Sequence, residues 1–192
     1  MITADDIQFT HHIDPLDVAA FFVRADHLRD EPDVTPMKLQ KLLYLAQANY
    51  LAATGERLFD ADVEAFEHGP VVYRVWQAYN GNQIIDPDAH SEANARVLSP
   101  DIETFLGAVW TRYQDWTASA LRYLTHRQAP WKDHYVDGAF RSRIPDAEMM
   151  SYFRSQVPVS ERLAHSNVVI VTPEVFEDDE VADQRLRAFL TA

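Results

Sequence analysis

A strongly apolar segment between Thr35 and Gly55 constrains the fold more than any other part of the chain. Thr35 is followed by Pro36, and a threonine N-cap with proline in the first turn marks a helix start, whereas glycine is typical just beyond a helix end. The apolar positions recur at helical spacing and extend over most of the helix surface: Leu39, Leu42, Leu43, Tyr44, Leu45, Ala46 and Tyr50. A helix that is apolar on nearly all sides is buried in the centre of a domain. The sequence therefore predicts a protein that packs around this helix.

Other helices are expected on either side of this segment. Their starts are marked by a capping residue or a proline before an apolar stripe, at Asp14, Ser99, Thr117 and Pro145. The stripe after Ser99 keeps helical spacing as far as Trp116. Residues Pro130-Trp131 are expected to end the helical unit that begins at Thr117.

Two short segments favour β-structure. Apolar and polar residues alternate over residues 62–67, and β-branched residues dominate residues 168–172. The sequence His68-Gly69-Pro70 is expected to break the chain and to start another helix directly. The predicted fold class is mainly α, a compact single-domain bundle of about six or seven helices with a small β element around 62–67 and 168–172.

The composition excludes several classes of function. The 192 residues include no cysteine, so disulfides, thiolate chemistry and cysteine-based zinc sites are impossible. No apolar run approaches the ~20 residues of a membrane span, and the N-terminal residues lack the pattern of a signal peptide. The formal charge of −13 argues against nucleic-acid binding unless the fold gathers a local basic patch. We therefore expect a cytoplasmic protein that binds neither membrane nor nucleic acid.

Three segments together resemble a known family. They are residues 35–47, with the sequence TPMKLQKLLYLAQ, residues 59–79, with EAFEHGPVV at their centre, and LTH at 124–126 followed by APWK at 129–132. In this order and spacing they are similar to the Panacea domain, or SocA-like antitoxin domain, formerly a domain of unknown function with phage-associated members. The likeness covers residues 10–157. The motif positions are Lys38, Leu39, Lys41, Leu42, Tyr44, Glu64, His68, Gly69, Pro70, Val71, His126, Pro130 and Trp131.

The resemblance implies a function in protein binding. Similar proteins are antitoxins that neutralise a cognate toxin by direct contact, and the toxin is expected to be encoded by an adjacent gene. One member of the family is an adaptor that delivers its toxin to a Clp-type protease, which is the first alternative. A small histidine-dependent enzyme is the second. No catalytic residue, metal or cofactor is expected.

The basic motif residues each allow two interpretations. His68 is either a turn residue whose ring bonds nearby backbone or a catalytic group, and turn residues usually serve the turn. His126 and His134 could cluster with Trp131 at a helix end, where Trp131 is expected to fill the core with its N–H satisfied. Lys38 and Lys41 lie three residues apart on one helix face. They could contact a partner, form a buried ion pair, or extend to solvent along a buried helix.

The last residues differ in character from the rest. Residues 158–192 match no part of the family pattern and form a C-terminal extension with a strand-like segment, an acidic stretch and a short amphipathic helix. The acidic stretch surrounds two apolar residues, a combination that suits recognition of a basic groove on a partner protein. A solvated loop is the alternative. The candidate partner-binding residues are Glu174, Val175, Phe176, Glu177, Asp178, Asp179 and Glu180.

Overall fold

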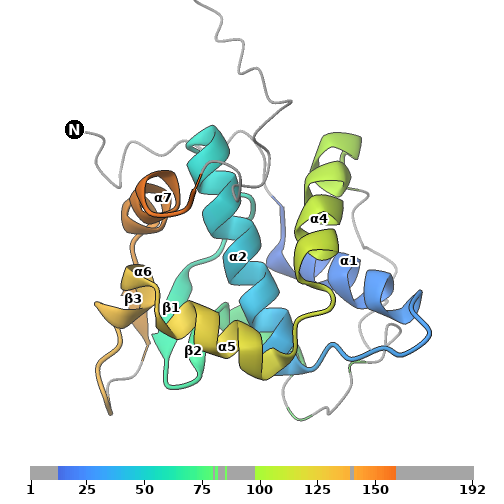
Figure 1. Cartoon of the computed structure of the whole chain (residues 1–192), viewed down its shortest axis with the longest axis horizontal. Coiled ribbons are helices and arrows are strands. Elements are labelled where there is room, and N and C mark those ends of the chain that lie inside the picture. Colours follow the sequence, from blue (N-terminus) through green and yellow to red (C-terminus); the bar gives the residue numbers. More distant parts are fainter. Residues whose placement is uncertain (1–12, 80, 82–84, 86–97, 139–140, 159–192) are drawn as a thin grey trace, which may run out of the picture.

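A computed structural model describes residues 13–79, 81, 85, 98–138 and 141–158 (Figure 1). Within this part of the chain the fold contains seven helices and one small sheet, so the predicted mainly α class is confirmed. The helices are α1 (Pro15–His27), α2 (Pro36–Thr54), α3 (Tyr73–Tyr79), α4 (Pro100–Tyr113), α5 (Ala118–His126), α6 (Ala129–Lys132) and α7 (Asp146–Ser155). The strands are β1 (Val63–Phe66), β2 (Gly69–Val71) and β3 (Ser142–Ile144).

Helix α2 is the centre of the fold, as the sequence predicts. The side-chain hydroxyl of Thr35 accepts a hydrogen bond from the backbone N–H of Lys38, and Gly55 ends the helix in a left-handed conformation at φ 82°. The helix packs against α1, α3, α4, α5, α7 and β2. Figure 1 shows it between α1 and α4 on one side and α7 on the other. Burial on all sides explains why its apolar residues are not restricted to one stripe.

Buried polar side chains of α2 hold the loops around it. The side-chain oxygen of Gln40 accepts a hydrogen bond from the backbone N–H of Val72 at 2.7 Å. The side-chain oxygen of Gln47 accepts two, from Leu58 at 2.9 Å and Phe59 at 3.2 Å. Each of these buried amides pairs with a backbone group that would otherwise be unsatisfied, a loss of about 1–3 kcal/mol per group. The central helix therefore holds the chain just before β1 and just after β2.

The sheet corrects the expectation for residues 68–72. The predicted strand at 62–67 is present as β1, but His68-Gly69-Pro70 does not start a helix directly. Residues 67–68 form the turn of a hairpin, and β2 pairs antiparallel with β1, with Glu64 opposite Val71. Strand β3 pairs on the other edge of β1, which gives the order β2-β1-β3. Helix α3 begins only after the hairpin.

Two helix ends also differ from expectation. Helix α4 ends at Tyr113, and Trp116 lies in the following turn with 41% of its surface exposed. Pro130 and Trp131 do not follow the last helix of their unit but lie within the single-turn helix α6. The strand-like segment at 168–172 and the acidic stretch lie outside the described residues.

Candidate functional site

The motif segments that are distant in sequence meet where α2 passes the hairpin. The ammonium of Lys41, on α2, donates a hydrogen bond to the carbonyl of Pro70, on β2, at 3.0 Å. Lys41 is 1% exposed, so it neither extends to solvent nor lies on the surface for a partner. Burial is the main cause that lowers the pKa of Lys41 to about 7, and the charge of Arg122 adds to it.

Gly69 is required for this approach. Its φ of +104° is in the left-handed region, where a side chain is strained. A Cβ added there would lie 2.6 Å from Cε and 2.8 Å from Nζ of Lys41, and 3.2 Å from the hydroxyl oxygen of Thr125. The hairpin can therefore contact α2 and α5 at this point only because the motif has glycine.

Helix α5 brings two more basic groups to the same place. Arg122 and His126 are four residues apart and so share a helix face. Desolvation lowers the pKa of His126, the charges of Arg122 and Lys41 lower it further, and the backbone of His68 works in the opposite direction. Nε of Arg122 and Nε2 of His126 are buried, and neither has a hydrogen-bond partner among the described residues. We call Lys41, Arg122 and His126 the basic cluster.

Trp131 closes this region from α6. Its ring stacks on His126 with centroids 3.8 Å apart, and on Tyr135 at 4.9 Å. Its indole N–H donates to the carbonyl of Phe66 at 2.9 Å, so the expected satisfied core tryptophan is confirmed. His134 does not join the stack: its Nδ1 lies 3.1 Å from the carbonyl of Pro130, and its Nε2 lies 3.5 Å from Glu148.

A second set of aromatic rings lies at the outer side of the hairpin. Tyr73 stacks between Phe66 at 6.4 Å and Trp76 at 5.5 Å, and all three rings are half-buried. The guanidinium of Arg141 lies 4.2 Å from the centre of the Tyr73 ring. Glu64 on β1 holds that guanidinium by a two-pronged ion pair at 2.7 to 3.0 Å. We call Phe66, Tyr73, Trp76 and Arg141 the aromatic strip.

The remaining motif residues lie in the core. Leu39, Leu42 and Tyr44 are 0% exposed, and the Tyr44 ring packs edge-on against Phe153. Lys38 is equally buried, and its ammonium bonds a carboxylate oxygen of Asp33 at 2.7 Å and the carbonyl of Gln114 at 2.6 Å. Of the interpretations open for Lys38, the ion pair is the one found.

The two histidines considered for catalysis differ in burial and in their neighbours. His68 is exposed in the hairpin turn, which agrees with a turn residue but places it between two strands, not at a strand-to-helix corner. His126 lies against Trp131. Within the described ranges no group of three or more histidine, aspartate or glutamate side chains is arranged to hold a metal ion. In the same part of the chain, no helix combines the length and apolarity needed to span a membrane.

Sequence reasoning did not single out Arg122 or Arg141, and it named Thr125 only as part of the LTH motif at 124–126. A signal for Arg122 was present, because it lies four residues before His126 in a helix that was predicted. Arg141 offered none, since its partner Glu64 is 77 residues away.

The fold and the site define a small, mainly α domain in which a central buried helix packs against a β-hairpin. Residues 39–132 match the model of the family described as antitoxin SocA-like, Panacea domain, so the resemblance seen in the motifs is confirmed over these residues. The match includes every motif position except Lys38 and lies inside the predicted range 10–157, whose ends stay a prediction. No curated protein and no solved structure is a significant match to the chain.

Proposed function

We propose that the protein is a cytoplasmic antitoxin that neutralises a partner toxin by direct protein–protein binding and not by catalysis. The observation that carries the proposal is the SocA-like match over residues 39–132, because antitoxins of this kind imply a protein partner. The motif residues support it, since most of them build the core or the junction of α2 with the hairpin. A rigid scaffold of this kind suits binding.

The aromatic strip is the surface that we propose for toxin contact. Binding hot spots are rich in tryptophan, tyrosine and arginine, and the strip offers all three. Its rings stack on one another, so little side-chain entropy remains to be lost when a partner binds. The acidic stretch from Glu174 to Glu180 is the second proposed contact, with Phe176 as its apolar anchor.

Co-expression with the product of the adjacent gene tests the proposal. We expect that product to arrest growth alone, and we expect the full-length protein to restore growth and to co-purify with it. A neighbour that is harmless, or that neither is rescued nor co-purifies, would contradict the antitoxin assignment. The half-life of the toxin with and without the protein separates simple neutralisation from delivery to a Clp-type protease.

Three alanine variants locate the contact. Trp76→Ala should weaken toxin binding about tenfold or more if the aromatic strip is the hot spot. Phe176→Ala tests the acidic stretch in the same way. Trp116→Ala is the matched control, because Trp116 is an exposed tryptophan that packs edge-on against Tyr113 and is not part of the strip. Equal binding by all three variants would place the interface elsewhere.

A further inference from the structure

The ammonium of Lys41 has more N–H donors than the acceptors found around it among the described residues. An ammonium carries three N–H donors. The hydrogen-bond acceptor that the described residues offer to Nζ is the Pro70 carbonyl alone. Buried cations are normally paired with a carboxylate or another anion, because an unpaired buried charge is costly. Lys41 has no ion pair within the described part of the chain.

The other two members of the basic cluster, Arg122 and His126, also have buried nitrogen atoms without an acceptor among the described residues. Within the part of the chain that the structure describes, Nε of Arg122 and Nε2 of His126 are buried without a hydrogen-bond partner. Neither side chain forms an ion pair with any described residue. These groups from α2 and α5 lie close together, because Arg122 lowers the pKa of Lys41 and both lower the pKa of His126, in a chain with a formal charge of −13.

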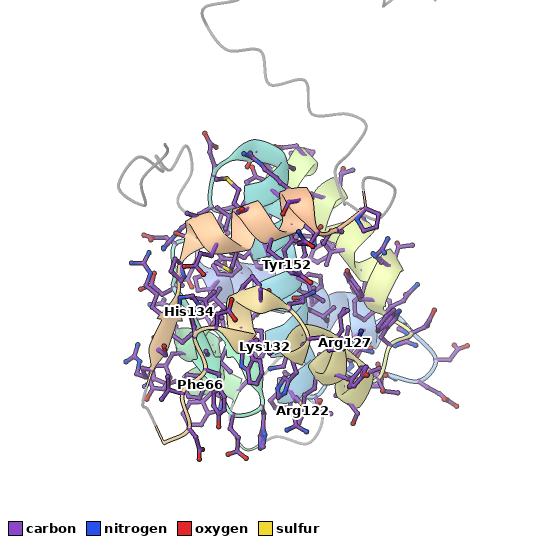
Figure 2. The ribbon with its side chains drawn as sticks, turned by 60° about the vertical axis from the view of Figure 1, so that its left-hand side comes forward. Phe66, Arg122, Arg127, Lys132, His134 and Tyr152 are labelled. Atoms are coloured by element: carbon purple, nitrogen blue, oxygen red, sulfur yellow. The ribbon has the colours of Figure 1, made fainter. Side chains whose placement is uncertain are left out.

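Two of the three cluster residues are partly exposed, and both lie on α5. Arg122 and His126 are half-buried, whereas Lys41 lies behind them against the hairpin. Figure 2 shows Arg122 together with Arg127 and Lys132 on the face formed by α5 and α6. Arg127 and Lys132 are exposed. They would attract an anion toward the cluster without contacting it once bound.

From these observations we propose that the basic cluster of Lys41, Arg122 and His126 is a binding site for a phosphate group, either free phosphate or a phosphate monoester. A phosphate dianion has enough acceptors for the unsatisfied donors of all three groups, and its charge favours the protonated forms of Lys41 and His126. A single carboxylate has only two oxygens and one negative charge, so it offers fewer acceptors to the three groups than a phosphate does. The proposal does not depend on the antitoxin function.

Thermal unfolding of the full-length protein tests the site. Inorganic phosphate is added against sodium chloride at equal ionic strength, and sodium acetate forms a third series. We expect saturating phosphate to raise the Tm by about 3 to 6 °C. Arg122→Gln should abolish the rise. Arg127→Gln removes the same charge from the same face and should keep it, which separates binding from general charge and from the salting effect of phosphate.

A second readout follows the site itself. Binding of the dianion should raise the pKa of His126, measured by NMR titration of its ring protons, in the wild type and in Arg127→Gln but not in Arg122→Gln. An equal Tm shift in all three proteins, an unmoved His126 titration, or an equal response to acetate would each overturn the phosphate assignment. Because no toxin enters the assay, its failure would leave the antitoxin proposal unaffected.

Discussion

Lys38 and Lys41 lie less than one turn apart on α2 and are both buried, yet their surroundings are opposite in charge. Lys38 meets the carboxylate of Asp33 and the carbonyl of Gln114. Lys41 meets one carbonyl and two further basic groups. The buried guanidinium of Arg57 resembles the Lys38 case, since it pairs with Asp146 at 2.6 Å and Asp62 at 2.8 Å. The difference separates cations that pair with carboxylates from Lys41, whose acceptor among the described residues is a neutral carbonyl.

The largest effect is expected at Lys38. Lys38→Met removes two charge-assisted hydrogen bonds from a fully buried position and should lower the free energy of unfolding by about 3 kcal/mol. Lys41→Met should cost less than half as much at pH 7, because it removes a single hydrogen bond to a neutral carbonyl, which offsets less of the desolvation of the ammonium. Urea unfolding of both variants at pH 7 measures the contrast. Equal losses would mean that the two lysines are equally well satisfied.

The close contact between Gly69 and Lys41 gives the next effect. Gly69→Ala combines a strained φ with an overlap at Lys41 and should destabilise the protein by about 2 to 3 kcal/mol. Gly81→Ala is the matched control, because Gly81 has a similar φ of +97° but no described residue within 4 Å of the added Cβ. It should cost about 1 kcal/mol. A difference near zero between the two variants would show that the hairpin moves away from α2 freely.

The pKa of Lys41 predicts a pH dependence of stability. The folded pKa is about 7, against an ordinary 10.5, so between these values the unfolded chain binds more protons and stability rises with pH. The slope from this group is at most about 1.4 kcal/mol per pH unit and vanishes below pH 7. Urea unfolding between pH 7 and 9.5, without phosphate, should give this rise in the wild type and a flat profile in Lys41→Met.

The upper limit of that range avoids the tyrosines. Burial raises the pKa of Tyr50 to about 12 and that of Tyr44 well above its usual range. For these groups the folded state holds the proton longer, so their contribution falls with pH above about 10. A wild-type profile that is flat from pH 7 to 9.5 would mean that Lys41 is not desolvated.

The smallest effect is expected at Asp33. Its side chain is 44% exposed, so its pair with Lys38 is partly screened by solvent. Asp33→Asn keeps an acceptor for Lys38 and should lower the free energy of unfolding by about 1 kcal/mol or less, with a smaller loss at high salt. Denaturant unfolding at low and at high salt measures both quantities. A loss as large as that of Lys38→Met would mean that the ion pair with Asp33 provides nearly all of the stabilisation that Lys38 contributes.

The helices could be predicted because their signals are local. Asp14 and Thr117 cap α1 and α5 through their side chains as expected, since a cap and its stripe lie within one turn of each other. Strands β2 and β3 have three residues each and owe their form to pairing with β1, which no local pattern records. For the same reason the sequence left the roles of Lys38 and Lys41 open: Asp33 is close in sequence, but Pro70 and Arg122 are not.

The buried amides of α2 also settle a question of helix orientation. A helix that is apolar on all sides could turn about its own axis without changing how much apolar surface it buries. Gln40 and Gln47 remove that freedom, because each accepts from backbone N–H groups fixed in neighbouring loops. A rotation of one residue, about 100°, would turn these side chains onto apolar neighbours and leave the loop amides unpaired. The hydrogen bonds of Gln40 and Gln47 therefore fix the orientation of α2 about its own axis.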